Sequence, residues 1–146
     1  MINKSVIRDI DYARDILLQD DYSIVVVKNN NILIKKKGEG IRPFLEVIKD
    51  LKEDIIDSVI ADRILGKASA LLCRYARVKG VYSPQATKTA IAILVMAGIP
   101  SQVDEMVSYI KNKRGDDVCP FEKMLKNIDS PTETYNILME KIFKKN

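Results

Sequence analysis

A run of four β-branched residues, Ile24–Val27, restricts the fold of this chain more than any other segment. β-branched side chains favour extended backbone, so the surrounding segment Tyr22–Lys28 is predicted to be a strand. Because the run is apolar on both faces, both faces of that strand must be covered. The sequence therefore predicts a central strand in a sheet with helices on each side, which is a three-layer α-β-α architecture.

Apolar periodicity predicts the other elements. The expected helices are Val6–Gln19, Arg42–Lys52, Ile60–Arg77, Gln85–Ala97, Cys119–Asn127 and a last one from Pro131 to about Phe143, capped by Ser130. The expected further strands are Ile32–Lys37, which forms a hairpin with the first strand, then Val78–Ser83 and Ser101–Val107. We expect one α/β domain over residues 1–146, with a mixed sheet of about 4–5 strands.

The sequence also indicates where in the cell the protein is located. The best apolar stretch, Ala90–Gly98, falls well short of the roughly 20 residues that a membrane span needs. The N-terminus carries two aspartates and no uninterrupted apolar stretch, which argues against a signal peptide. Cys73 and Cys119 are then expected to be reduced thiols. We therefore expect a cytoplasmic protein that does not contact a membrane.

The charge is mildly basic, because 24 basic and 20 acidic side chains give a net charge of +4. The lysines gather locally at Lys35–Lys37 and at Lys141, Lys144 and Lys145. Nucleic-acid-binding surfaces usually interleave aromatic side chains with such cations, and here none are interleaved. We expect both clusters to be solvated ends of a strand and a helix, and we expect no nucleic-acid partner.

The chain contains no histidine, which excludes several kinds of site. An imidazole-bound metal and a Ser-His or Cys-His catalytic pair cannot form. Proton transfer would have to use Glu, Asp, Lys, Tyr or Cys. Oxygen ligands for Mg²⁺ are available in Asp116, Asp117 and Glu122, but their spacing matches no established loop, so we expect these carboxylates to be solvated.

Three motifs resemble the cytidine-deaminase-like superfamily. Gly66–Leu72 is similar to the helix that starts with His/Cys-Ala-Glu in that superfamily, and Val81–Pro84 is similar to the strand that ends in Pro before a Cys-x-x-Cys helix. Ala97–Ile99 followed by Val103 resembles the end of that helix and the next strand. The order of a hairpin, a helix and then β-α-β also matches. The resemblance implies a cytidine-deaminase-like fold.

Nearly the entire chain also resembles a bacterial and archaeal family of unknown function that has this fold. The segments that carry the resemblance are Asp21–Ser23, Ala61–Arg63, Gly66–Ala68 and Cys119–Glu122. This resemblance implies a prokaryotic protein.

The zinc-binding positions of deaminases are changed in this chain. Zinc deaminases use a His or Cys ligand two residues before the catalytic Glu, and two more Cys from the next helix. In the matching register Leu65 takes the ligand position, Lys67 takes the position of the Glu, and Gln85–Lys88 follow Pro84. None of these residues is a soft metal ligand. The resemblance thus implies a deaminase-like fold that works without zinc, and we expect no metal and no cofactor.

Two residues are candidates for chemistry in the implied pocket. Lys67 would lie at a helix N-terminus, where the dipole and partial burial lower the pKa of a lysine, as a Schiff-base or general-base lysine requires. Its alternative is a surface lysine. Cys119 precedes Pro120 at a predicted helix start, where backbone N–H groups stabilise a thiolate. Its alternative is a buried structural cysteine, with Glu122 as a capping residue.

The remaining candidates are ligand-binding groups of the same pocket. Asp62 is expected to cap the helix that contains Lys67, or to pair with Arg63 or a ligand. Ser83 and Gln85 are expected to hydrogen-bond a base or sugar edge. Glu122 is expected to complete the pocket beside the cysteine.

Two hypotheses of function follow. In the first, the chain is a zinc-free deaminase-fold protein that binds a nucleotide-like or other small polar ligand around Lys67 and Cys119. If it is an enzyme, Cys119 is the nucleophile, or Lys67 the nucleophile or base. In the second, it is a non-enzymatic binding or assembly module in which the pocket is vestigial and the helical faces form a homo-oligomer. The residues leave open whether the protein is an enzyme.

Overall fold

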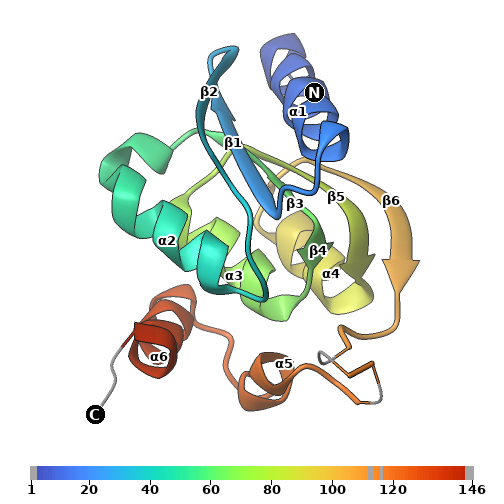
Figure 1. The fold of residues 1–146 in the computed structure, drawn as a ribbon, viewed down its shortest axis with the longest axis vertical. Helices are drawn as coiled ribbons and strands as arrows, with labels where there is room; N and C mark the ends of the chain where they lie inside the picture. The colour runs from blue at the N-terminus through green and yellow to red at the C-terminus, as the bar shows by residue number, and fades with distance from the viewer. Residues whose placement is uncertain (1–2, 112–113, 116, 144–146) are drawn as a thin grey trace.

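Six strands from the first three quarters of the chain form one mixed sheet (Figure 1). The computed structural model describes residues 3–111, 114–115 and 117–143. Its strands are β1 (Ile24–Lys28), β2 (Asn31–Lys36), β3 (Val59–Asp62), β4 (Ile64–Leu65), β5 (Gly80–Thr87) and β6 (Ser101–Val107). Its helices are α1 (Lys4–Gln19), α2 (Arg42–Leu51), the 3₁₀ helix η1 (Lys52–Ile55), α3 (Lys67–Ala76), α4 (Lys88–Met96), α5 (Pro120–Met124) and α6 (Pro131–Phe143).

The sheet combines an antiparallel hairpin with a parallel part. β1 pairs antiparallel with both β2 and β3, whereas β3, β4 and β6 all run parallel to β5. β3 and β4 follow each other along one edge of β5 in a single register, since Val59 pairs with Gly80 and Leu65 pairs with Ala86. The carboxyl ends of these parallel strands consequently lie at the same edge of the sheet.

Pro84 explains why this register is interrupted. The pairing registers place Pro84 opposite Arg63, between β3 and β4, and opposite Asp104 on β6. Proline has no N–H group to donate to a ladder, so it falls at a gap on each side. The side chains of the two residues opposite Pro84 form contacts elsewhere. Asp104 accepts a hydrogen bond from the hydroxyl of Tyr82, and Arg63 donates to the carbonyl oxygen of Leu17 in α1.

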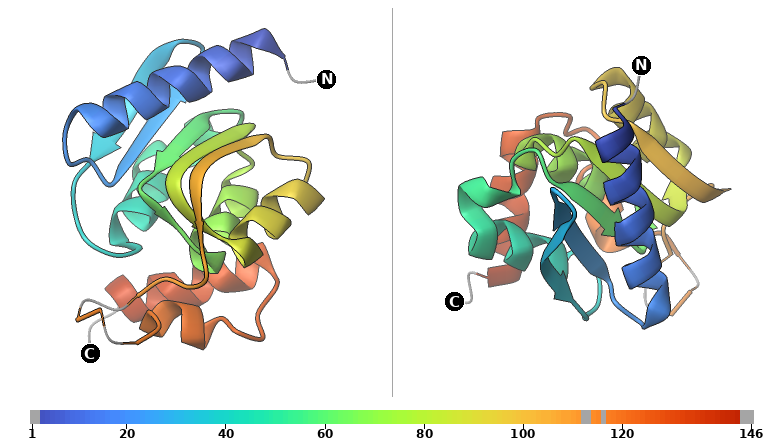
Figure 2. Two further views of the ribbon diagram at one scale, coloured as in Figure 1. Left: turned by 90° about the vertical axis from the view of Figure 1, so that its right-hand side faces the viewer. Right: turned by 90° about the horizontal axis from the view of Figure 1, so that it is seen from above.

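Helices cover both faces of the sheet, as the views of Figure 2 show. α1 packs Leu17 and Ala13 against one face, in a core that includes Val25 and Val27 of β1. The opposite face carries α2, α3, α4 and α6, over a core that includes Ile24 and Val26 of the same strand. Ile24–Val27 is almost completely buried. The expected three-layer α-β-α arrangement with a mixed sheet is confirmed.

One predicted helix is wrong over its first part. Ile60–Arg77 was expected to be helical throughout, but its beginning forms β3 and β4, and α3 starts only at Lys67. Val59, Ile60 and Ala61 are all fully buried because β3 is covered on both faces. A strand that is apolar on both faces shows no alternation, so its residues also fitted a helical stripe. Gly66 forms the N-cap of α3.

A second boundary differs around Pro84. The sequence predicted a strand that ended at Ser83 and a helix from Gln85, whereas β5 continues to Thr87 and α4 begins at Lys88. The side chain of Thr87 caps α4 by accepting a hydrogen bond from the N–H of Ala90. Val95 on this helix is 65% exposed, although an apolar side chain on an apolar helix is expected to be buried.

The C-terminal segment, residues 117–143, packs against α2 and α3. Leu125 and Leu138 are fully buried in the core below it. The rings of Tyr75 on α3 and Tyr135 on α6 stack with their centroids 4.2 Å apart. Ser130 caps α6 by accepting a hydrogen bond from the N–H of Glu133, as the sequence predicts. The segment is therefore a packed part of the domain.

Candidate functional site

A cleft of about 1180 Å³ lies where the C-terminal segment meets the sheet and the β2–α2 loop. It borders Asp62 and Ile64, at the end of β3 and in β4, and therefore lies at the carboxyl ends of parallel strands. This is the edge at which open α/β sheets generally bind ligands. The lining residues are Ser23, Gly38, Glu39, Gly40, Ile41, Arg42, Asp62, Arg63, Ile64, Gly66, Ala68, Ser69, Ile110, Lys111, Arg114, Cys119, Pro120, Phe121, Glu122, Lys141 and Ile142.

Basic side chains outnumber acidic ones around this cleft. Its basic residues come from separate elements and are Arg42, Arg63, Lys111, Arg114 and Lys141. Its acidic residues are Glu39, Asp62 and Glu122. Lys111 and Lys141 form no ion pair with another described residue. Since a concave surface focuses the field of its charges, the cleft favours anions.

Asp62 is the most perturbed acidic group of the cleft. Asp62 as a whole is only partly buried, but its Oδ2 atom is shielded from solvent and has no hydrogen-bond partner in the described chain. Burial raises the pKa of Asp62 to about 7, although a hydrogen bond from Ser69 and the N–H groups of Ile64 and Arg63 act in the opposite direction. The carboxyl group therefore exchanges its proton near neutral pH. The expectation that Asp62 caps α3 is wrong, because Asp62 ends β3 and Gly66 is the N-cap.

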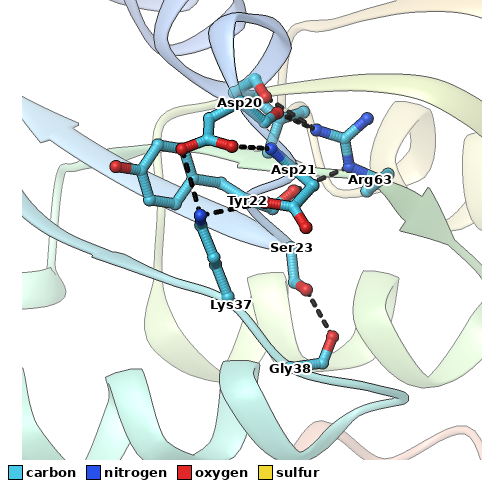
Figure 3. A network of polar contacts seen from close by, with 8 residues as sticks. Asp20, Asp21, Tyr22, Ser23, Lys37, Gly38 and Arg63 are labelled. Atoms are coloured by element: carbon cyan, nitrogen blue, oxygen red, sulfur yellow. Dashed lines mark hydrogen bonds and ion pairs between the residues drawn. The ribbon is translucent and has the colours of Figure 1, made fainter.

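Arg63 holds the end of α1 against the sheet (Figure 3). Its Nη2 atom lies 2.7 Å from the carbonyl oxygen of Leu17 and 2.9 Å from that of Asp20. Its Nε atom donates to the carbonyl of Tyr22 over 2.7 Å. The last carbonyls of a helix lack partners within the helix, so the guanidinium satisfies groups that would otherwise need water.

Three more contacts lie near Arg63 in Figure 3. The ammonium of Lys37, just beyond β2, lies 3.0 Å from the carboxylates of both Asp20 and Asp21. The hydroxyl of Ser23 donates to the carbonyl of Gly38. Together with Arg63, these bonds join the end of α1, the start of β1 and the loop after β2.

Glu122 reaches from α5 to the beginning of α3. Its two carboxylate oxygens accept hydrogen bonds from the N–H groups of Lys67 at 2.8 Å and Ala68 at 3.0 Å. Gly66 has no side-chain cap of its own, and a Cβ atom there would collide with the carboxylate. Glu122 thus acts as a cap supplied from a distant part of the chain, at the helix end where a negative charge is most favourable.

The side chain of Lys67 points to the C-terminal segment rather than into the cleft. Its Nζ atom lies 3.0 Å from the carboxylate of Asp129 and 3.1 Å from the carbonyl oxygen of Lys126. Only 12% of the side chain is exposed, and Lys67 is not among the residues that line the cleft. The carboxylate of Glu122 and the ammonium of Lys67 therefore both join the start of α3 to the C-terminal segment, and together these contacts form the α3–α5 clasp.

Ser83 and Gln85 lie outside the cleft, because β5 carries them along the middle of the sheet. The buried hydroxyl of Ser83 donates to the carbonyl of Gln85 over 2.7 Å. The amide of Gln85 donates to the carboxylate of Glu105 over 2.9 Å. The sequence predicts both residues beside the other site residues because the expected strand ends at Ser83, whereas β5 continues to Thr87.

The two cysteines occupy different environments. Cys119 is the N-cap residue of α5, as the sequence predicts, and it lines the cleft together with Glu122 and Asp62. Cys73 is completely buried in α3, where desolvation and then the charge of Asp62 raise the pKa of its thiol. Of the six predicted site residues, the structure therefore brings three together in one cleft.

No three His, Cys, Asp or Glu side chains in the described ranges come together as a metal site would require. Asp117 pairs with Lys123, whereas Asp116, Lys144 and Lys145 lie outside the described residues. No helix in the part of the chain that the structure describes is long and apolar enough to cross a bilayer.

Sequence reasoning missed several residues of the cleft. Lys111 and Arg114 lie on the connection after β6, and Arg42 begins α2. No recognised motif marks any of these three residues. The Gly38–Glu39–Gly40 loop carried a usable signal, because two glycines around a polar residue permit close approach of a backbone to a ligand.

Comparisons with known proteins found two similar solved structures and one matching family model. A crystal structure of a DUF1893 family protein from Thermotoga maritima has a TM-score of 0.84 with this chain, at 24% identity, and covers 97% of this chain and 93% of that chain. RibD from Acinetobacter baumannii matches with a TM-score of 0.43 and 17% identity, over 68% of this chain and 34% of that one. A search of curated proteins found no match.

The family model described as domain of unknown function DUF1893 matches residues 12–142. The expected resemblance to a family of unknown function is confirmed, and membership of the deaminase-like superfamily stays a prediction. Because the matched residues include nearly all of the sheet, the cleft and both C-terminal helices, the chain belongs to the DUF1893 family.

Proposed function

We propose that the cleft binds a small anionic ligand of the nucleotide type and that this binding is the function of the domain. The observation that carries the proposal is the excess of basic side chains around a cleft at the carboxyl ends of parallel strands. Lys111 and Lys141 on the C-terminal side are placed to contact a phosphate group, since neither is used in an ion pair among the described residues. Phosphate binding by lysine needs no particular geometry beyond proximity, because the ammonium acts as a point charge.

In this proposal the protein is a deaminase-fold binding domain that works without zinc in a prokaryotic cytoplasm. Cys119 remains the candidate nucleophile, because it lines the cleft and lies at the start of α5. The role that the contacts of Lys67 favour is to hold the C-terminal segment, since both its charge partner and its carbonyl acceptor lie there. The base or nucleophile role expected for Lys67 would require these contacts to break.

Calorimetric titration with nucleoside monophosphates, ribose 5-phosphate and inorganic phosphate tests the proposal. We expect binding that weakens as salt is added, because phosphate contacts are screened. Lys141→Glu is expected to weaken it about 10-fold, since one partly exposed ion pair contributes up to roughly 1 kcal/mol and the reversed charge repels the phosphate.

Lys88→Glu is the matched control for this substitution. Lys88 is exposed at the start of α4, outside the cleft, and its replacement changes the net charge by the same amount. The control should bind like the wild type. Equal weakening in both variants, or no binding of any phosphate compound at millimolar concentration, would contradict the proposal.

A second candidate function, assembly without catalysis, is favoured by α4. This helix is apolar in most directions, yet only Ala90 and Leu94 are buried, while Val95 and Met96 are 65% and 88% exposed. A helix that is apolar all round is usually covered. If assembly is the function, native mass spectrometry at micromolar concentration should show a homo-oligomer that dissociates in Met96→Glu, whereas a monomer would remove this candidate.

A further inference from the structure

The sheet has two edge strands, β2 and β6, which lie at opposite sides of it (Figure 1). Among the described residues β2 pairs only with β1, and β6 pairs only with β5. Each of the two strands therefore leaves the N–H and C=O groups along one side without a strand partner. Open edges of this kind can pair with a strand of another chain.

The two edges carry charges of opposite sign. On β6, the carboxylates of Asp104 and Glu105 accept hydrogen bonds from neutral side chains of β5. On β2, the ammonium of Lys35 lies 5.0 Å from the centroid of the Tyr22 ring. None of these three charged groups forms an ion pair with another residue that the structure describes. Each edge therefore keeps a charge that its own chain does not neutralise.

These charges decide which edges can pair between copies of the chain. Two β6 edges would bring Asp104 and Glu105 of both copies together. Two β2 edges would bring Lys35–Lys37 of both copies together, although Lys36 and Lys37 are already ion-paired. Like charges on paired strands are destabilising, whereas opposite charges stabilise the pair. The pairing that the charges favour is therefore β2 of one copy with β6 of the next.

The strand directions are compatible with this pairing. β2 runs antiparallel to β1, and β1 runs antiparallel to β3, so β2 has the same direction as β3, β5 and β6. A second copy that is moved sideways along the sheet, without being turned over, would add its β2 as a parallel strand beside β6. Its α1 would lie on the same face as α1 of the first copy, and one sheet would continue through both copies.

The registers also bring the unneutralised charges close together. One row of paired residues crosses the whole sheet, and its members are Lys35, Val25, Ala61, Tyr82 and Gln102. Continuing this row into a second copy places its Lys35 opposite Gln102, two residues from Asp104. Lys35 and Asp104 share the α1 face, because their partners Val25 and Tyr82 both belong to the core under α1. Diagonal neighbours on one face are about 7–8 Å apart, within reach of a long side chain.

The helices on the other face support the same arrangement. α4 packs beside β6, and α2 packs beside β2. Both helices cover the same face of the sheet. In the continued sheet α4 of one copy would lie next to α2 of its neighbour. This contact would reduce the exposure of α4, whose apolar side chains Val95 and Met96 are exposed in the single chain.

We propose that the protein assembles with further copies of itself by pairing β2 of one copy with β6 of the next. The contact joins two different surfaces, so every added copy leaves one β2 and one β6 free. Assembly therefore proceeds beyond a dimer as the protein concentration rises. No residue of β2 or β6 lines the cleft, so this inference is independent of the anion binding proposed above.

The test exchanges the two charges that the registers bring together. Sedimentation velocity from micromolar to millimolar protein should show wild-type species larger than a dimer, and fewer of them as salt is added. Lys35→Asp and Asp104→Lys should each weaken this association about 10-fold, because an attractive pair becomes a repulsive one. The double variant, and an equimolar mixture of the two single variants, should associate like the wild type. Recovery in the mixture also shows that both single variants are folded.

Lys126→Asp and Glu140→Lys are the matched controls. Both residues are exposed in the C-terminal segment and lie outside the two edge strands. Their replacement changes the net charge by the same amounts as the two test substitutions. Both controls should associate like the wild type, because the effect depends on the place of the charge and not on the total.

Three results would overturn the inference. The first is a wild type that stays monomeric over this concentration range, which would leave anion binding in the cleft untouched. The second is association of the single variants as strong as that of the wild type, since the oligomer would then form through another surface such as α4 alone. The third is a mixture of the single variants that does not recover the association.

Discussion

Replacing Glu122 with alanine is expected to lower the free energy of unfolding by about 3 kcal/mol, which is roughly 10 °C in melting temperature for a domain of this size. The carboxylate accepts from two N–H groups at the start of α3, at 2.8 and 3.0 Å, and both bonds are charge-assisted. Without it, α3 would begin at Gly66 with no side-chain cap. Urea and thermal unfolding followed by circular dichroism would measure the loss.

Two further variants serve as comparisons for Glu122→Ala. Glu140→Ala removes an exposed glutamate from α6 and should change the stability by less than about 0.5 kcal/mol. Glu122→Gln keeps one acceptor oxygen without the charge, so its free energy of unfolding should fall between those of the wild type and the alanine variant. A melting temperature of Glu122→Ala equal to that of Glu140→Ala would show that the clasp does not stabilise the fold.

Arg63→Ala is expected to cost about 2–3 kcal/mol, because one guanidinium satisfies three carbonyl oxygens. These carbonyls belong to the end of α1 and to the connection between α1 and β1, so the loss of their hydrogen bonds should also loosen α1. Arg63→Lys should recover only part of the stability, since an ammonium on a flexible stem does not reproduce a planar fork of donors. Limited proteolysis, with cleavage near residues 17–22, reports on α1 directly.

Arg74→Ala is the matched control, because Arg74 is exposed near the end of α3 and does not line the cleft. It should melt close to the wild type and resist cleavage near α1. If Arg63→Ala behaves in the same way, the three bonds in Figure 3 contribute little and α1 is held by its apolar face alone.

Local sequence patterns predict the outer elements of this fold well. α1, the β1–β2 hairpin, β6 and the capped α6 each carry periodicity or turn residues of their own. β3 could not be recognised in the same way, because a short strand buried on both faces has no period that distinguishes it from a helix. The path of β5 through Pro84 also depends on tertiary structure, since it requires gaps in both neighbouring ladders.

The candidate site was predictable only in part, for a related reason. The sequence predicts Asp62 as a capping or ligand-binding group and Cys119 as a thiol at a helix start, and both line the cleft. The direction of the Lys67 side chain depends on Asp129, which is remote in sequence. Glu122 was expected to act near its own helix, but it caps α3 from 55 residues away. Contacts between segments so far apart are set by packing and leave no local signal.

The α3–α5 clasp also affects how hydrogen exchange proceeds at α3. The first N–H groups of a helix have no acceptor within the helix, and they usually exchange with solvent deuterium quickly. In this protein the amides of Lys67 and Ala68 are bonded to Glu122, so they exchange only when α5 moves away. The start of α3 and the C-terminal segment are therefore expected to open together, and hydrogen exchange at these two amides would report that opening.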